Sequence, residues 1–317
     1  MVFFIIYQVC KMPFELTILG SSSATPTPDR FPSAQYLVSG DHHMLIDCGE
    51  GAQIQMMRNG LKSFKVDKIF ISHLHPDHFL GLPGLISSMS LQGRTAALDL
   101  YCPKGLQEIL EVQFLFGEVH LNYELNYHIH EGDKKEVIFE DKRLKIISFP
   151  VNHRVPCRGF LFIEKKLPRK INKLIPETSS LPQEAYTVLR SGRDFTDPEG
   201  NVLRFEEYTI PNEAPLSYCY ITDTMFEPEV AASLKEYQID LLYHEATFMH
   251  ELKDKATATY HSTAKEAAEF AGICRAKKLL IGHFSSRYKD LEPLLNEARA
   301  VFPQTYLAIE GEKFLLP

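Results

Sequence analysis

The sequence predicts an α/β domain arranged as a four-layer αββα sandwich, with two central β-sheets covered by helices. Strand-like runs recur along most of the 317 residues, with turn or helix signals between them. The first half of the chain is rich in strands, the second half alternates strands with helices, and each half ends in helices. A chain of this length is long for one domain and short for two, so we expect one large domain.

The composition is that of an ordinary soluble globular enzyme, with 44% hydrophobic and 24% charged residues. The formal net charge is -7, so any contact with nucleic acid must come from a local basic patch. The six cysteines are scattered and form no Cys-x-x-Cys pair. This pattern favours reduced thiols in a cytoplasmic protein over a disulfide scaffold.

The first eleven residues, MVFFIIYQVCK, differ in character from the rest of the chain. Their apolar run is too short to span a bilayer, and it lacks the basic start and small-residue cleavage site of a secretory signal. Because Met12 opens directly onto a strand-like run, our hypothesis is a misassigned start, with residues 1–11 an N-terminal extension and residues 12–317 the domain. No transmembrane segment is predicted elsewhere, so we expect no membrane partner.

In the first half of the chain, short β-branched and aromatic runs bounded by turn residues predict strands. These runs are 14–20, 34–40, 43–51, 68–72 and 97–102. Helical signals, including a closing glycine for the first helix, predict three helices. These are 51–60, 79–90 and 104–116.

Further along, the same signals predict four more strands, two helices and a last strand. The four strands are 144–153, 216–223, 239–248 and 277–283, and the helices are 263–276 and 291–302. A segment at about 164–212 interrupts this pattern and is rich in proline, charge and turn residues. Such a composition is typical of an insertion or an elaborated connection rather than core, so we expect an arm-like segment there.

One short loop carries the strongest chemical signal in the chain. Its sequence, His73-Leu-His75-Pro-Asp77-His78, follows the strand-like run KIFIS. Histidines at i and i+2 cannot share a helix face, whereas an extended strand end aims both rings the same way. Imidazole and carboxylate ligands together suit Zn²⁺ and its neighbours Mn²⁺ and Fe²⁺. A solvated histidine-rich loop is the alternative, but this density of ligand residues favours a metal site.

Three more candidate ligands, His153, Asp223 and His283, stand at the ends of apolar strands. In α/β folds functional residues gather at the carboxyl ends of strands, so we expect these residues to meet the histidine loop. A lone histidine in such a place is more often structural, but three such endings favour a shared site. The whole set is too large for one tetrahedral ion and fits two ions with Asp223 between them. The set is His73, His75, Asp77, His78, His153, Asp223 and His283.

Several segments, taken in order, resemble the ribonuclease Z family of the metallo-β-lactamase superfamily. They are IDCGEG (46–51), FISHLHPDHFLGLPGL (70–85), VNHRVPCRGF (151–160), HEATF (244–248), HST (261–263) and GHFSSRY (282–288). The histidine loop alone marks only the superfamily, whereas the last three motifs are far more specific. The resemblance runs from about residue 13 to residue 317 and implies the metallo-β-lactamase fold. It also implies a zinc-dependent endoribonuclease that removes the 3′ trailer of precursor tRNA.

The resemblance implies a division of the ligands between two Zn²⁺ ions per subunit. One ion is held by His73, His75 and His153, the other by Asp77, His78 and His283, and Asp223 bridges both. The residues themselves do not fix this partition, and Mn²⁺ or Fe²⁺ remain compatible with it. The resemblance further implies a homodimer.

The same resemblance suggests that His261 protonates the departing 3′ oxygen and that Glu245 orients its ring. The alternative for His261 is a capping or core histidine. Asp77 is expected to relay a proton in addition to binding metal. Thr263, with Glu266 three residues later, is expected to cap the following helix in a capping box.

Other polar residues have weaker claims on the site. Asp47 and Glu50 are expected to hydrogen-bond ligand histidines, with a turn role as the alternative. Arg287 follows the last ligand closely and is a candidate phosphate ligand, unless it is a plain surface arginine. The loop SSSATPTPDR (21–30) is either a donor to RNA phosphates or a simple connection.

The chain departs from the family pattern in its glycines and its arm. Pro76 and Thr222 stand where the family usually has glycine, and neither change removes a ligand. Family members carry an arm with a Gly-Pro-rich tip that grips the tRNA elbow, and no such tip is evident at 164–212. A local basic stretch does occur there and is expected to contact RNA. Its cations are Lys165, Lys166, Arg169, Lys170 and Lys173.

Two other functions remain in view. A hydrolase of the same fold acting on small phosphodiesters or other esters is the main alternative, and weak basic features in the arm would favour it. A non-catalytic RNA-binding relative is disfavoured because all seven ligands are present. A lactamase is disfavoured because HEATF and HST belong to the nuclease pattern.

Overall fold

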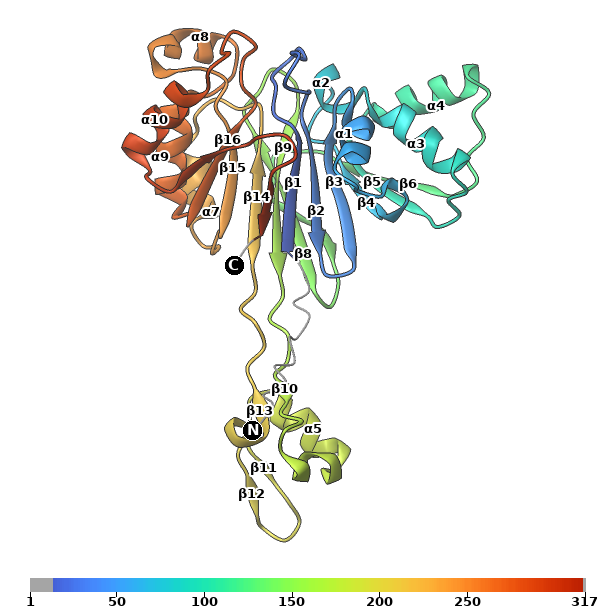
Figure 1. Ribbon diagram of the computed structural model, residues 1–317, viewed down its shortest axis with the longest axis vertical. Helices are drawn as coiled ribbons and strands as arrows, with labels where there is room; N and C mark the ends of the chain where they lie inside the picture. Colours follow the sequence, from blue (N-terminus) through green and yellow to red (C-terminus); the bar gives the residue numbers. More distant parts are fainter. Residues whose placement is uncertain (1–13, 316–317) are drawn as a thin grey trace, which may run out of the picture.

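The computed structural model describes residues 14–315. Two seven-stranded sheets pack face to face with helices on the outer face of each, so the predicted four-layer sandwich is confirmed (Figure 1). The hypothesis about residues 1–11 lies outside the described residues. Within residues 14–315, no helix has both the length and the apolar character that a membrane crossing requires.

The first sheet is antiparallel at one edge and parallel from β3 onwards. In spatial order it contains β18 (Lys313–Leu315), β1 (Phe14–Gly20), β2 (Ala34–Ser39), β3 (His42–Cys48), β4 (Lys68–Phe70), β5 (Leu98–Pro103) and β6 (Leu125–His130). On its side of the molecule lie α1 (Ala52–Arg58), η1 (Ser63–Lys65), α2 (Pro76–Phe79), α3 (Leu82–Leu91) and α4 (Leu106–Phe116).

The second sheet is parallel from β14 to β17 and antiparallel beyond. In spatial order it contains β17 (Thr305–Leu307), β16 (Lys278–Gly282), β15 (Leu241–Glu245), β14 (Ser217–Ile221), β9 (Cys157–Glu164), β8 (Leu144–Val151) and β7 (Glu136–Glu140). Its helices are α7 (Pro228–Leu234), η3 (His250–Leu252), α8 (Lys253–Ala258), α9 (Ala264–Cys274) and α10 (Glu292–Val301).

An aromatic core joins the two sheets. The Phe70 ring of the first sheet lies 5.5 Å from Phe160 and 5.3 Å from Phe162 of the second. Phe162 in turn stacks on Tyr218, and all four side chains are fully buried. Burial of each such side chain contributes about 1.5–3 kcal/mol, so this layer fixes how the sheets face each other.

Several element boundaries differ from the prediction. The helix expected at 79–90 is mainly α3, and the short α2, which Pro76 opens, lies just before it, with Leu80 and Gly81 between the two. Strands β6, β7 and β9 were not predicted; β6 and β7 lie at sheet edges and expose several side chains to solvent, whereas β9 is a buried strand inside the second sheet. Edge strands lack the continuous apolar run that marks a buried strand. The capping box of α9, from Thr263 to Glu266, is confirmed.

The arm, residues 165–215, connects β9 to β14 and projects from one end of the sandwich, whereas α2 lies at the other end (Figure 1). It lies where the insertion was expected. Its elements are β10 (Lys170–Ile171), η2 (Pro176–Ser180), α5 (Gln183–Arg190), β11 (Phe195–Thr196), β12 (Val202–Leu203), α6 (Phe205–Tyr208) and β13 (Thr209–Ile210).

A histidine links the two sheets near the base of the arm. His42 Nδ1, in the first sheet, lies 2.7 Å from Asp67 Oδ2, and its Nε2 lies 2.9 Å from Asp141 Oδ2 in the turn between β7 and β8. The Asp67 hydrogen bond raises the pKa of His42, against the opposing effect of burial. Burial raises the pKa of both carboxylates, but hydrogen bonding to His42 helps to lower it overall. Lys68 Nζ also donates a hydrogen bond to Asp67 Oδ2, at 2.8 Å, and adds a positive charge beside this carboxylate.

This link should make stability depend on pH. Because the folded-state pKa of His42 is raised, the stabilisation is complete below the unfolded pKa of about 6.5 and is lost as the pH rises through the folded value. We expect His42→Ala to cost about 1 kcal/mol more in the free energy of unfolding near pH 6 than near pH 9, a modest figure because both carboxylates are a third exposed. Urea denaturation at both pH values measures it. His120→Ala, which removes an exposed imidazole, is the control, and an equal loss at both pH values would contradict the link.

Candidate metal centre

The fold brings the candidate ligands to one edge of the sandwich. The histidine loop follows β4 in the first sheet, while His153, Asp223 and His283 follow β8, β14 and β16 in the second. These strands run so that their carboxyl ends lie at the same edge. All seven predicted ligands therefore meet between the sheets, in two groups that share one carboxylate.

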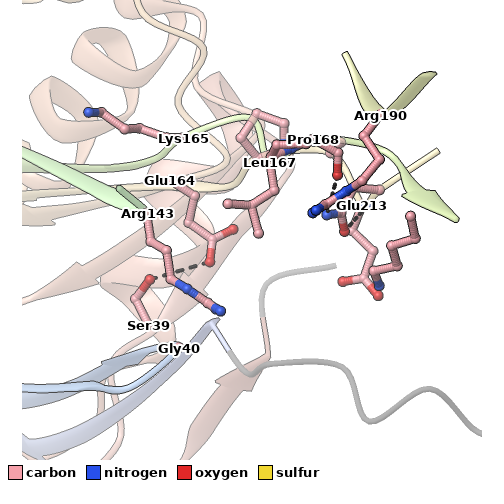
Figure 2. A pocket seen from close by; sticks show the side chains of 13 residues that line it. Ser39, Gly40, Arg143, Glu164, Lys165, Leu167, Pro168, Arg190 and Glu213 are labelled. Atoms are coloured by element: carbon pink, nitrogen blue, oxygen red, sulfur yellow. Dashed lines mark hydrogen bonds between the residues drawn. The ribbon is translucent and has the colours of Figure 1, made fainter. Parts of the chain in front are cut away.

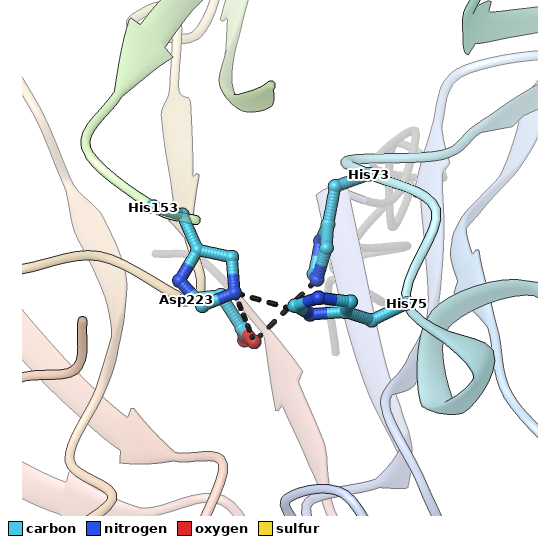
Figure 3. Close-up of side chains that lie close together, drawn as sticks. All are labelled: His73, His75, His153 and Asp223. Atoms are coloured by element: carbon cyan, nitrogen blue, oxygen red, sulfur yellow. Dashed lines mark hydrogen bonds and ion pairs between the residues drawn. The ribbon is translucent and has the colours of Figure 1, made fainter. Parts of the chain in front are cut away.

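The first group is His73, His75, His153 and Asp223, whose ligand atoms all lie within 4.8 Å of one another (Figure 3). His153 Nε2 is 3.1 Å from His75 Nδ1. Asp223 Oδ2 is 3.5 Å from both His73 Nε2 and His153 Nε2. Three imidazoles and one carboxylate oxygen thus converge on a common point.

The second group is Asp77, His78 and His283, again within 4.8 Å. Asp77 Oδ2 lies 3.3 Å from His78 Nε2 and 3.5 Å from His283 Nε2. The other oxygen of Asp223, Oδ1, lies 3.4 Å and 3.0 Å from the same two nitrogens. Asp223 therefore faces one group with each of its oxygens.

The arrangement of these side chains suits a bound metal ion better than it suits hydrogen bonds among the side chains themselves. The Nε2 atoms of His73, His78 and His283 are buried and lack a hydrogen-bond partner among the described residues. Burial lowers the pKa of His73 to about 4, so its ring is neutral at pH 7, the form that binds a cation. Burial also lowers the pKa of His283, but Asp223, Asp77 and Glu245 together outweigh burial and raise the value to about 10. The carboxylates thus stabilise positive charge in the site, and a bound cation would supply that charge.

Asp47 holds the histidine loop from behind. Its Oδ2 accepts hydrogen bonds from His78 Nδ1 and Tyr220 Oη, both at 2.7 Å, and from Ser72 Oγ at 2.8 Å. The supporting role expected for Asp47 agrees with these contacts. Glu50 is exposed at the turn before α1, where it is poorly placed to hydrogen-bond a buried imidazole.

The loop at 21–30 contacts the site through its backbone. The amide of Ala24 donates to Asp77 Oδ2 at 2.8 Å, which orients this carboxylate. Half-buried Glu310 anchors the loop by accepting from Ser21 N at 3.0 Å and from Phe31 N at 3.2 Å. The loop is therefore more than a simple connection.

His261 and Glu245 form the expected pair beside the ligands. Glu245 Oε1 lies 2.9 Å from His261 Nδ1 and also accepts from Thr224 N at 2.8 Å. Burial lowers the pKa of His261, but the charge and hydrogen bond of Glu245 outweigh burial and raise it overall. His261 also lies within ligand distance of Asp223 and His283, so the geometry alone permits either a protonating or a ligand role.

Thr247 is a site residue that the sequence reasoning missed. Its hydroxyl donates to Glu245 Oε2 at 2.5 Å and lies 3.0 Å from His283 Nδ1. Since its single proton is given to Glu245, it accepts from His283 and leaves His283 Nε2 free for a cation. Its place in the motif HEATF was the available signal.

An open cavity of about 430 Å³ gives access to the ligands. Arg154 lines it, together with Thr259, His261 and five of the candidate ligands, which are His75, Asp77, His153, Asp223 and His283. The predicted phosphate ligand, Arg287, is not among the described lining residues; its guanidinium lies 5.0 Å from the Phe248 ring and its Nε donates to Ser285 Oγ. Arg154 was missed, although it directly follows the ligand His153.

The basic stretch of the arm divides into engaged and exposed cations. Lys165 Nζ pairs with Glu140 at 2.6 Å, and Arg169 donates to Thr209 Oγ1 at 2.6 Å while lying over the Phe205 ring. Lys165 and Lys170 line a second cavity, of about 420 Å³, between the arm and the sandwich (Figure 2). Lys166 and Lys173 are exposed.

Curated relatives that match nearly the whole chain are named ribonuclease Z. The chain is 43% identical over 298 residues to ribonuclease Z of Bacteroides fragilis, covering 94% of this chain and 97% of that protein. It is 46% identical over 305 residues to ribonuclease Z of Cytophaga hutchinsonii, covering 96% of each. A family described as "Anti-Pycsar protein Apyc1" matches residues 14–158.

The solved structures agree with the sequence relatives. Human tRNase Z, short form, superposes with a TM-score of 0.71 and 28% identity, covering 96% of this chain and 99% of that one. The metallo-β-lactamase fold protein YhfI from Bacillus subtilis superposes with a TM-score of 0.67 and 17% identity, covering 96% and 99%. The second likeness shows the fold alone, and it is the fold expected from the motifs.

Proposed function

The chain belongs to the ribonuclease Z family, and on that premise we propose that it is an endoribonuclease that removes the 3′ trailer of precursor tRNA. The observation that carries the proposal is the arrangement of seven ligand residues around Asp223, next to the His261–Glu245 pair. A binuclear ligand set suits hydrolysis of a phosphodiester, and an adjacent acid suits protonation of an alkoxide leaving group.

We propose that the centre holds two Zn²⁺ ions, with Mn²⁺ or Fe²⁺ compatible with the same donors. His73, His75 and His153 would hold one ion, and Asp77, His78 and His283 the other, with Asp223 shared. When bound, such a pair of ions lowers the pKa of a water molecule and offsets negative charge on the phosphate oxygens. The neighbours of the ligands, Asp47, Ala24 and Thr247, hold them in orientation.

In the proposed reaction, His261 supplies the proton that the mature tRNA end needs. Water attacks phosphorus, the bond from phosphorus to the 3′ oxygen breaks, and His261 gives its proton to that oxygen. The products are a tRNA with a 3′-hydroxyl and a trailer with a 5′-phosphate. Glu245 holds His261 Nδ1 and so leaves Nε2 as the nitrogen for transfer. Asp77, oriented by Ala24, is proposed to relay a proton from the attacking water.

RNA binding is proposed to depend on local charge. The arm carries eight Lys and Arg residues against eight Asp and Glu residues, so its net charge gives no attraction. Its hairpin turn is acidic, since Asp197 and Glu199 lie between β11 and β12. Five cations of the arm are exposed, namely Lys166, Lys173, Arg190, Arg193 and Arg204. Within the basic stretch, Lys166, Lys173 and the half-buried Lys170 are the proposed contacts. Arg154 in the cavity is proposed to meet a phosphate near the reacting bond.

Small phosphodiesters are the second candidate substrates. The arm has an acidic turn and no net charge, so its basic character is weak, and this favours the small-substrate alternative. The open cavity, about 430 Å³, admits a small diester without any contribution from the arm. Comparing precursor tRNA with an aryl phosphodiester separates the two candidates.

We also propose a cytoplasmic homodimer. The helices α1, α3 and α4 on the first sheet expose large apolar side chains, among them Met57, Leu91, Leu115 and Phe116. Leu91 is 89% and Phe116 84% exposed. Apolar residues of this size and exposure are typical of an interface, and reduced, scattered cysteines support a cytoplasmic setting.

Loss of a ligand should abolish all hydrolysis. We expect His75→Ala or Asp77→Ala to stop cleavage of both precursor tRNA and an aryl phosphodiester, because each change weakens cation binding and removes preorganised charge stabilisation. Turnover should be measured with metal analysis of the same preparation. Near-wild-type turnover in zinc-supplemented buffer would show that this loop is not the active centre.

Replacing His261 should affect the two substrates differently. We expect His261→Ala to lower kcat for precursor tRNA by about 10²–10⁴-fold, the usual contribution of a general acid. Hydrolysis of bis(p-nitrophenyl) phosphate should change little, because nitrophenolate leaves without a proton. An equal loss with both substrates would identify His261 as a ligand rather than an acid.

The three remaining lysines of the basic stretch should matter for RNA alone. We expect the triple change of Lys166, Lys170 and Lys173 to alanine to raise KM for precursor tRNA and to flatten its salt dependence, since each phosphate contact steepens that dependence. Hydrolysis of the aryl diester should not move, because the arm lies far from the reacting bond. The charge-matched control replaces Lys62, Lys104 and Lys235, which are exposed outside the arm. If both triple variants behave alike, RNA is gripped elsewhere.

A further inference from the structure

A threonine hydroxyl contacts the shared carboxylate of the centre. Thr222 directly follows β14 and precedes Asp223, and both residues are buried. Its Oγ1 donates to Asp223 Oδ1 at 2.8 Å. Asp223 has a φ of 40°, a left-handed conformation that turns its side chain away from the strand direction.

The accepting oxygen faces only one ligand group. Oδ1 lies 3.0 Å from His283 Nε2 and 3.4 Å from His78 Nε2. Oδ2, which faces His73 and His153, receives no hydrogen bond from Thr222. A carboxylate oxygen has two lone pairs, so Oδ1 can accept from Thr222 and still face a cation.

This hydrogen bond restricts the rotation of the Asp223 carboxylate. The terminal torsion of an aspartate is broad, and rotation about it would move Oδ1 and Oδ2 out of their two groups together. Thr222 is β-branched and so has few side-chain conformations, and its own carbonyl is fixed 3.9 Å from Cys157 Sγ. The glycine usual at this position in the family has no hydroxyl to offer.

We propose that Thr222 is a positioning residue for the metal centre. Its hydroxyl fixes the rotation of the Asp223 carboxylate, so that one oxygen serves each ligand group. Through Oδ1 it acts mainly on the group of Asp77, His78 and His283. The inference rests on the proposed metal centre. The test must therefore distinguish a wrong role for Thr222 from a wrong metal centre.

The test measures zinc affinity rather than activity. Purified, metal-free full-length chains compete with a chromophoric chelator for Zn²⁺, which yields the number of bound ions and the affinity of each. We expect Thr222→Val and Thr222→Ala to weaken one of the two sites by about 10-fold or more, the usual effect of losing an outer hydrogen-bond partner. Thr222→Ser, which keeps the hydroxyl, should bind as the wild type does.

A threonine away from the site provides the matched control. Thr305 is also fully buried, but its hydroxyl donates to the carbonyl of Phe302 rather than to a ligand. Thr305→Val therefore removes a comparable buried hydroxyl and should leave both zinc affinities unchanged. The absorption spectrum of Co²⁺-loaded chains is a second readout, which should change in Thr222→Ala and not in Thr222→Ser.

The outcomes are distinct. If the wild-type chain binds no zinc, the proposed centre itself is wrong. If the wild type binds two ions and Thr222→Ala binds both equally well, the centre stands and the role of Thr222 is overturned. Equal weakening in Thr222→Ser and Thr222→Ala would also overturn it, because the shape of the side chain rather than its hydroxyl would then matter. If Thr222→Val fails to fold, the alanine and serine variants decide.

Discussion

The site depends on one buried carboxylate, Asp47, which ties both sheets to the histidine loop. It lies at the end of β3 and accepts four hydrogen bonds, from the amide and hydroxyl of Ser72, from His78 Nδ1 and from the hydroxyl of Tyr220 in the second sheet. A charge in a core is costly unless such partners satisfy it. Because these donors come from both sheets and the loop, Asp47 fixes the candidate ligand His78 relative to the second sheet.

Three residues with an unusual left-handed backbone conformation lie at the same edge of the sandwich. Asp47, Asp223 and His283 each have a positive φ, 55°, 40° and 57°, although none is glycine. Each follows its apolar strand run or closes it, so the left-handed turn swings a polar side chain into the space between the sheets. Such conformations cost on the order of 1–3 kcal/mol each and persist where surrounding contacts over-determine them. The hydrogen bonds of Asp47, and the carboxylate of Asp223 beside His283, supply those contacts.

The sequence predicted the layers and the ligand positions because both are local signals. His153, Asp223 and His283 each end an apolar run, and strand direction alone brings such ends to one edge. Thr247 and Arg154 could not be found this way, since their importance comes from contacts with residues distant in sequence. The edge strands β6 and β7 were missed because solvent exposure removes their apolar pattern. The engaged state of Lys165 and Arg169 likewise depends on tertiary partners, Glu140 and Phe205.

The charges of the cavity explain why this fold needs cations. Asp47, Asp77, Asp223 and Glu245 place four carboxylates in or beside the cavity. Among the described residues lining it, Arg154 alone carries a permanent positive charge. A phosphodiester approaching these carboxylates would be repelled, and the chain as a whole has a net charge of -7. Cations held by the histidines and carboxylates reverse the local sign. The same ions would therefore admit the substrate and complete the buried electrostatics of the fold.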